Sequence, residues 1–368
     1  MKKFDSLTKS YFLYFLILVG LVVFRILSAC GVFNLFGDTA EYIFTFIVQI
    51  VLLFGLSVFM FARINHKSAK DVLNDYKFKK LSKKSIFISI LIGFIVYFLN
   101  SYIASFFLFI LSLFGYSPSF STKVATSYPI WLLLINIIFT AVLPAVCEET
   151  VHRGMLLCEI KKKNIKKAII ISSLLFGLLH INIYQFFYAA ILGGLLAVVT
   201  LTTDSIYPAM IIHLMNNALN VYMSFASTNN LFSAKVVNLI FTMANMNTFL
   251  GVLFYIIFFV FLVICLIELY RQLCKESVKN KLSLMHEKLN VFLTRKIYFE
   301  ECLNLKEGEE ANKQKEVNAT IINDFFNQNG EIIEKKDKNH GVFAKLFLIA
   351  SVFLSALTTL FTLVWGII

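Results

Sequence analysis

The chain has 368 residues, of which 58% are hydrophobic and only 15% are charged. A soluble domain has about half of its residues apolar and about a quarter charged, so this composition excludes an ordinary soluble protein. The net charge of +12 could indicate a nucleic-acid-binding protein, but the Lys and Arg residues lie in short segments between long apolar runs. We therefore expect contact with membrane lipid and no nucleic-acid partner.

The apolar runs have the length of membrane-spanning helices, which need about 20 apolar residues to cross a bilayer. The sequence therefore predicts an all-α membrane protein, a polytopic transmembrane helical bundle with about eight or nine spans. In chain order, the expected spans are residues 11–35, 40–63, 86–115, 129–157, 168–185, 186–203, 206–226, 246–270 and 343–367. The two spans within 168–203 are short, and only the segment 182–185 separates them.

The basic segments predict the orientation of these spans. Four segments are rich in Lys and Arg: residues 1–10, 63–85 and 158–167, and the chain after Arg271. They alternate with loops that are poor in positive charge, which places the N-terminus in the cytoplasm. The heavy use of Phe (40 residues), Ile, Asn and Lys is typical of an AT-rich genome. We therefore expect a multi-pass protein of the cell membrane of a Gram-positive bacterium.

The chain divides into five parts by composition. Residues 271–342 differ from the rest because they are of mixed charge, and we expect a cytoplasmic segment that is helical at its start and partly disordered. The parts are an N-terminal transmembrane hairpin with a basic loop (1–85), a transmembrane core (86–226), a further transmembrane helix (227–270), the charged segment (271–342) and a C-terminal transmembrane helix (343–368).

Ionisable residues within a membrane span are costly and are candidates for function. Three spans carry polar motifs: Glu148, Glu149, His152 and Arg153 in the fourth, His180 at the end of the fifth, and His213 with Asn216, Asn217 and Asn220 in the seventh. Arg25 in the first span is expected to be a structural partner or a snorkelling side chain. Asn216 and Asn220 are expected to form hydrogen bonds between helices.

The three motifs lie at similar depths. At 1.5 Å per residue, Glu148 and His180 are roughly 15 and 18 Å from the basic loop 158–167, and His213 is roughly 10 Å from the turn at 202–205. We therefore expect the motifs to converge in the cytoplasmic half of the membrane.

The spacing of the acidic residues predicts separate roles for them. Positions four apart share one face of a helix, so Glu149 and Arg153 should form a buried ion pair, which leaves Glu148 about 100° away. Pro144 removes a backbone hydrogen bond just before Glu148 and favours a kink. A kink there could widen a water-filled cavity beside Glu148. A carboxylate in this cavity can take a proton from water, and His and Asn can supply N–H donors to an oxyanion. The chemistry indicated is hydrolysis.

The motifs resemble the signature of the CPBP family of intramembrane proteases, also called the Abi or type II CAAX prenyl endopeptidase family. The resemblance covers roughly residues 130–220, and its motifs read Glu148-Glu149-…-Arg153, Phe176-…-His180 and His213-…-Asn217. It implies that Glu148 activates water with His180 as its partner and that His213 and Asn217 stabilise the oxyanion. Glu149, Arg153 and Phe176 would support the site. His152 departs from the family, which has an aromatic residue there, and it could pack like that aromatic or alter the site.

The resemblance implies an endopeptidase that needs no metal and cleaves a membrane-associated peptide or protein near the cytoplasmic leaflet. A zinc-dependent version would use Glu148, His180 and His213 as ligands. A second alternative is a non-proteolytic protein for bacteriocin self-immunity or partner regulation, for which residues 271–342 are the candidate partner-binding segment. A transporter is the weakest alternative, because the two halves of the chain show no internal repeat.

Overall fold

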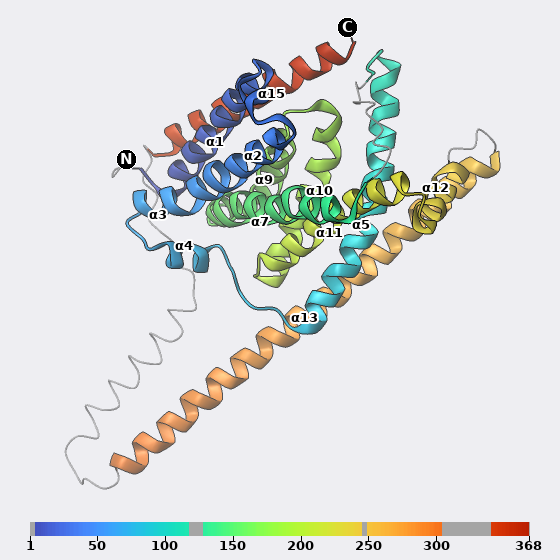
Figure 1. Cartoon of the computed structure of the whole chain (residues 1–368). Coiled ribbons are helices and arrows are strands. Elements are labelled where there is room, and N and C mark those ends of the chain that lie inside the picture. The colour runs from blue at the N-terminus through green and yellow to red at the C-terminus, as the bar shows by residue number, and fades with distance from the viewer. Residues whose placement is uncertain (1–3, 118–127, 245–248, 304–339, 368) are drawn as a thin grey trace. The chain divides into compact units, whose positions relative to one another are not determined.

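The computed structural model describes residues 4–117, 128–244, 249–303 and 340–367, and this part of the chain is helical, without strands (Figure 1). The elements are α1 (Ser6–Ala29), η1 (Val32–Thr39), α2 (Ala40–Phe46), η2 (Ile47–Met60), α3 (Phe61–Ile64), α4 (Ala69–Asp75), α5 (Lys83–Leu113), α6 (Ile130–Asn136), η3 (Ile137–Val142), α7 (Leu143–Glu149), η4 (Thr150–Leu156), α8 (Leu157–Lys161), α9 (Ile165–Leu179), α10 (Ile183–Thr203), α11 (Tyr207–Thr228), α12 (Phe232–Ala244), α13 (Phe249–Leu303) and α15 (His340–Ile367).

Within these described residues, seven helices are long and apolar enough to cross a membrane: Ser6–Ala29, Ala40–Ile64, Lys83–Leu113, Ile130–Lys161, Ile183–Thr203, Phe249–Asn280 and Gly341–Thr362. This result confirms a polytopic helical membrane protein. The spans expected at 168–185 and 206–226 are not among the seven. α9 has only 15 residues, and α11 contains a histidine and three asparagines, which lower its hydropathy.

Two of the long helices change their winding along their length. The helix Ala40–Ile64 contains the π-helical segment η2, and the helix Ile130–Lys161 contains η3 and η4 on either side of α7. Pro144 is the second residue of α7, between these two π-helical segments, and the kink expected there stays a prediction. Such turns are rare and often occur at functional sites.

The polar motifs lie where several helices pack together. α9 lies along α10, α11 lies along α5, and η2 contacts α7 (Figure 1). Apolar side chains of α5, α10 and α11 form one buried cluster that includes Ile92, Leu196 and Ile212. α1 and α15 run in the same direction, because Phe4 contacts Phe343 at their N-terminal ends.

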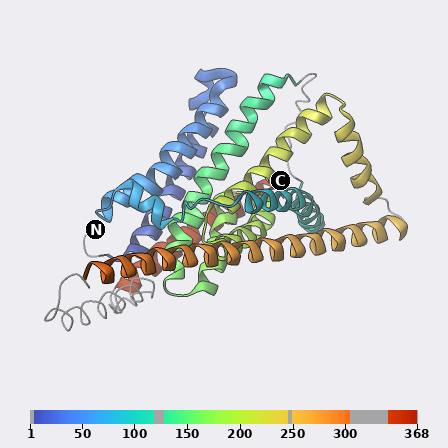
Figure 2. The ribbon, with the colours of Figure 1, turned by 90° about the horizontal axis from the view of Figure 1, so that it is seen from below.

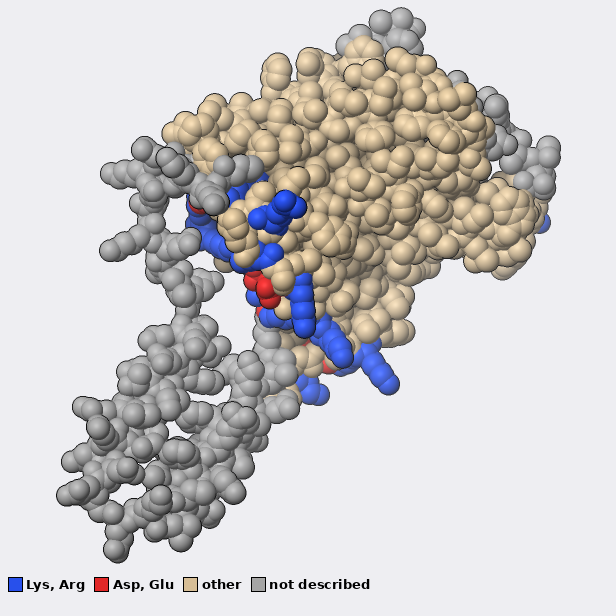
Figure 3. Space-filling model, turned by 60° about the vertical axis from the view of Figure 1, so that its left-hand side comes forward, with Lys and Arg blue, Asp and Glu red and all other residues tan. Residues whose placement is uncertain are grey.

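The basic loops meet at one end of the helices, as their alternation along the chain predicts. Figure 3 shows Lys and Arg side chains gathered there, with few elsewhere on the visible face. Ion pairs between loops that are distant in sequence join Asp5 to Lys163, Lys79 to Asp204, and Lys84 to Glu276. That this end faces the cytoplasm stays a prediction.

The charged segment begins as a helix, as expected, because α13 continues to Leu303 (Figure 2). The described residues of this segment beyond Ser277 belong to a different unit from residues 4–277 and 340–367. The remainder of the expectation for 271–342 concerns residues 304–339, which lie outside the described part of the chain.

Candidate active site

Glu149 is the paired carboxylate of the site. Its Oε2 atom lies 3.0 Å from Nε of Arg153, and its Oε1 atom lies 2.9 Å from Nδ1 of His213. All three side chains are buried. The ion pair expected from the four-residue spacing is therefore present, and it extends to the next motif through His213.

Arg153 also binds the backbone of α10. Its Nη2 atom donates a hydrogen bond to the carbonyl of Gly193 at 3.0 Å. A Cβ atom at position 193 would lie 3.1 Å from Cα of Ser173 and 3.2 Å from Cβ of Phe176, which is tighter than ordinary contact. The absence of a Cβ atom at Gly193 therefore lets α10 pack close against α9. In this position the Gly193 carbonyl can accept the hydrogen bond from Arg153.

Phe176 on α9 is the apolar centre of the cluster. Its ring lies edge to face with His152, His180 and His213, at centroid distances of 5.0, 5.3 and 5.5 Å. The guanidinium carbon of Arg153 lies 4.5 Å from the ring centroid, as in a cation–π contact. Such contacts depend on the ring quadrupole and therefore fix orientation as well as burial. One aromatic ring thus orients side chains from η4, α9 and α11.

Glu148 is only partly satisfied. Its Oε1 atom accepts a hydrogen bond from Nε2 of Gln49 at 3.1 Å, and its side chain is nearly buried, with 9% exposed. Its Oε2 atom is buried and has no hydrogen-bond partner in the described part of the chain. A buried carboxylate oxygen without a partner is costly in free energy, and such groups in folded proteins call for a functional explanation.

His180 ends α9 and leaves one ring nitrogen available. Its Nδ1 atom lies 3.0 Å from the carbonyl of Phe176. Because a carbonyl can only accept, Nδ1 is the donor, and Nε2 of the neutral ring keeps its lone pair. The charge of Glu148 acts on this ring, although no hydrogen bond joins the two residues within the described structure.

His152 packs as an aromatic side chain would. Its ring lies edge to face between Tyr14 and Phe176, at centroid distances of 5.7 and 5.0 Å. Nδ1 lies 2.8 Å from the carbonyl of Glu148, while Nε2 is buried without a partner in the described structure. Of the two possibilities left open by the sequence, the geometry favours packing.

Asn217 stands apart from the other expected site residues. Its Nδ2 atom donates to the carbonyl of Thr140 at 3.2 Å, and its Oδ1 atom accepts from Asn216 at 3.0 Å. In the described part of the chain it forms no hydrogen bond with Glu148, His180 or His213. Its contact with Thr140 nevertheless joins α11 to the helix that carries Glu148.

Gln49 and Tyr14 belong to the site but were not predicted from the sequence. Tyr14 donates its hydroxyl to the carbonyl of Leu175 at 2.6 Å and supports the ring of His152. Gln49 is a polar residue within a long apolar run, so the rule that singled out Arg25 could have found it. Nothing distinguishes Tyr14 from other aromatic residues in its span. Arg25 itself is exposed on α1.

The zinc alternative has no preformed cluster in this structure. In the described part of the chain, no three His, Cys, Asp or Glu side chains lie together as a metal site would require. Nδ1 of His213 is held by Glu149, and Nδ1 of His180 by a carbonyl, so Nε2 of both rings is left open. The zinc-dependent version stays an alternative, and no step of the chemistry below uses a metal.

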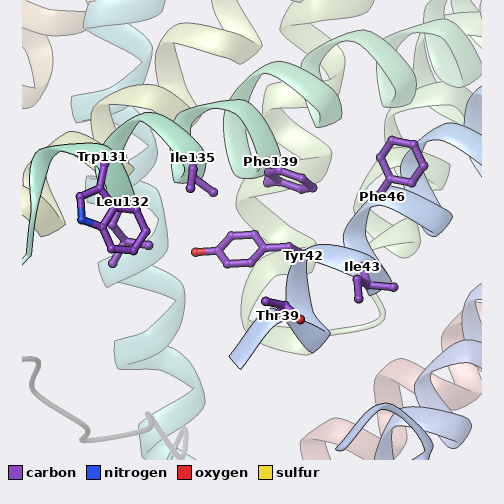
Figure 4. A pocket seen from close by; sticks show the side chains of 8 residues that line it. All are labelled: Thr39, Tyr42, Ile43, Phe46, Trp131, Leu132, Ile135 and Phe139. Atoms are coloured by element: carbon purple, nitrogen blue, oxygen red, sulfur yellow. The ribbon is translucent and has the colours of Figure 1, made fainter. Parts of the chain in front are cut away.

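An apolar groove of about 760 Å³ lies between the two helices that carry Gln49 and Glu148 (Figure 4). It is lined by Thr39, Tyr42, Ile43, Phe46, Trp131, Leu132, Ile135 and Phe139. Within the groove, the Tyr42 hydroxyl donates to Oδ1 of Asn136 at 2.7 Å. Glu148 lies roughly 13 Å further along the helix from Phe139.

Comparisons with known proteins agree with the motifs. A match to an uncharacterized protein of Mycoplasma capricolum subsp. capricolum is 31% identical over 192 residues. It covers 49% of this chain and 55% of that protein, so the chain spans about half the length of this relative. No solved structure matches. Residues 129–219, which contain Glu148, His180, His213 and Asn217, match the type II CAAX prenyl endopeptidase Rce1-like family, consistent with the CPBP resemblance of the three motifs.

Proposed function

We propose that this protein is an intramembrane endopeptidase in which Glu148 activates the water that hydrolyses a peptide bond. The observation that carries the proposal is the buried Oε2 atom of Glu148, which has no hydrogen-bond or ion-pair partner among the described residues. Both oxygens of the adjacent Glu149, by contrast, lie within 3.0 Å of a nitrogen of Arg153 or His213. A general base needs an oxygen whose lone pairs are free to accept a proton from a water molecule beside it, whereas a structural carboxylate does not. The family match of residues 129–219 supports a peptidase.

The proposed reaction begins when Glu148 takes a proton from water and the hydroxide attacks the scissile carbonyl. Nε2 of His180 is the available partner that orients this water. The oxyanion accepts hydrogen bonds from the N–H groups of Asn217 and of Nε2 of His213. Because Nδ1 of His213 already carries a proton, a proton on Nε2 makes the ring an imidazolium, and Glu149 balances its charge. The proton held by Glu148 then passes to the leaving amine, and the C–N bond breaks.

The substrate class that we propose is a membrane-associated peptide or protein that is cleaved near the cytoplasmic leaflet. The apolar groove along the helices of Gln49 and Glu148 supports a membrane-associated substrate, because it offers apolar surface for such a chain. The groove lies toward the ends of these helices that are remote from the basic loops, so the choice of leaflet rests on the depth of Glu148 and not on the groove. The proposed location is the cell membrane.

Comparative peptidomics tests the proposal, with strains that carry the wild type, Glu148→Gln or Glu159→Gln. Glu159 is a matched control because it is buried in the same long helix but pairs with Lys162, outside the cluster. We expect product peptides in the wild type and in Glu159→Gln, and none in Glu148→Gln. Cleavage by Glu148→Gln at the wild-type rate would overturn the proposal.

A function in immunity or partner regulation would instead survive Glu148→Ala and His180→Ala and fail when residues 271–342 are deleted.

A further inference from the structure

Three asparagine side chains form a chain of hydrogen bonds that ends on the helix that carries Glu148. Nδ2 of Asn100 on α5 donates to Oδ1 of Asn216 at 2.9 Å, and Nδ2 of Asn216 donates to Oδ1 of Asn217 at 3.0 Å. Nδ2 of Asn217 then donates to the carbonyl of Thr140 at 3.2 Å. Every bond points in the same direction, from α5 through α11 to η3.

The close approach of α5 and α11 makes the first bond possible. A Cβ atom at Gly93 would lie only 2.5 Å from Cβ of Met215, so the two helices touch at this glycine. Asn100 follows Gly93 by seven residues, which places both on one face of α5. The short side chain of Asn100 can therefore reach Asn216, and both are buried, with 8% and 5% exposed.

The last acceptor in the chain is a backbone carbonyl of η3, close to Pro144. Pro144 has no N–H to donate to the carbonyls of the preceding turn. Asn217 donates to the Thr140 carbonyl at 3.2 Å, at an exposed position of the helix. Because a carbonyl can only accept, Thr140 sets the direction of every bond in the chain.

The chain leaves one group of Asn217 uncommitted. Its oxygen is bonded to Asn216, and one of its two N–H groups is bonded to Thr140. The second N–H is the donor that an oxyanion needs. If the amide turned over, its oxygen would face the Thr140 carbonyl and its nitrogen would face the Asn216 nitrogen, so both contacts would become repulsive.

We propose that Asn100 and Asn216 are positioning residues that hold the Asn217 amide with an N–H, and never its oxygen, presented to the reaction. This inference rests on the proposed function, in which Asn217 stabilises the oxyanion. Asn100 does not touch the reacting atoms. It acts by fixing the orientation of Asn216, which in turn fixes that of Asn217.

The test measures kcat, KM and the thermal unfolding midpoint of the purified full-length protein, with the peptide substrate found by the peptidomics. In Asn100→Leu the first donor is lost at nearly constant volume. We expect kcat to fall about fivefold, the effect of one hydrogen bond, while KM stays within about twofold. Asn220→Leu is the matched control, because Asn220 is exposed on α11 and donates only to the carbonyl of Asn216.

Asn220→Leu should keep the wild-type kcat. If Asn100→Leu does not fold, Asn100→Ser replaces it, because the shorter serine hydroxyl does not reach Asn216 and the same loss of kcat is expected. A wild-type kcat in the Asn100 variant, or an equal loss in Asn220→Leu, would overturn this inference alone. Activity retained by Glu148→Gln would instead overturn the proposed function, whatever Asn100→Leu does.

Discussion

The two sides of the polar cluster differ in how completely their carboxylate is paired, although the two carboxylates belong to adjacent residues of one helix. On the Glu149 side, both carboxylate oxygens have cationic or N–H partners, Arg153 and His213. On the Glu148 side, one oxygen accepts from Gln49 and the other has no partner in the described structure. A turn of about 100° between neighbouring residues is enough to separate a structural carboxylate from a reactive one.

The comparison shows how a membrane protein can keep a reactive acid buried. The paired side joins η4, α10 and α11 through Arg153 and His213, and this scaffold does not depend on Glu148. Glu148 can therefore remain incompletely bonded at a cost in free energy that the neighbouring network offsets. Variants on the two sides should separate stability from activity.

The largest expected effect is on the paired side. Arg153→Met leaves the Glu149 carboxylate buried with only His213 as a partner, and removal of one member of a buried ion pair costs about 3–5 kcal/mol. We expect the free energy of unfolding to fall by that amount, measured by denaturant titration in detergent micelles. Arg63→Met is the control, since Arg63 is exposed, and should unfold like the wild type. Equal stability of the two variants would contradict the scaffold role of Arg153.

The unpaired side should show the reverse pattern. Gln49→Leu removes the only donor to Glu148 in the described structure and also removes an amide oxygen that is itself unpartnered. A hydrogen bond to a charged group contributes about 1.5–3 kcal/mol, so loss of this orienting contact should lower kcat at least about tenfold. The unfolding midpoint should change little, because the oxygen without a partner disappears as well. A variant that loses stability but keeps kcat would place Gln49 in the scaffold instead.

The smallest effect is expected at the basic end, where ion pairs are open to solvent. Although partial burial opposes it, the hydrogen bond from Lys79 and the charges of Lys77 and Lys79 lower the pKa of Asp204 below its ordinary value. Asp204→Asn should destabilise the protein by less than about 1 kcal/mol at neutral pH. Because the folded-state pKa is lowered, this contribution is present above about pH 4 and is lost as the pH falls through the folded pKa.

Thermal unfolding of the wild type and Asp204→Asn at pH 7 and pH 3 would measure this difference. A gap between the two proteins that widened at pH 3 would contradict the assignment.

Sequence reasoning found the parts of the site that depend on one helix or on charge alone. The Glu149–Arg153 pair follows from a four-residue spacing, and the convergence of three motifs follows from span length and loop charge. The contact of Gln49 with Glu148 could not be found in this way, because it requires knowing that η2 packs against α7. Phe176 was expected to support the site, but its contacts with three histidines depend on the packing of α9, α11 and η4.

The fold shows the same division. Hydropathy located the long spans, but α9 and α11 were also predicted to be full spans. The apolar pattern shows neither that α9 ends after a few turns nor that α11 carries a polar face. The π-helical turns were missed because they change the hydrogen-bond step by one residue without changing the apolar pattern.

These π-helical turns decide where the helix Ile130–Lys161 can lose a residue. Each holds one residue more than an α-helical turn would at the same place. Deleting a single residue within Ile137–Val142 would restore regular winding, and the helix on either side would keep nearly the same faces. A deletion within the regular helix Ile130–Asn136 has no wide turn to absorb it, so the residues before it would turn by about 100° relative to Glu148. Trp131, which lines the groove, would then face a different neighbour.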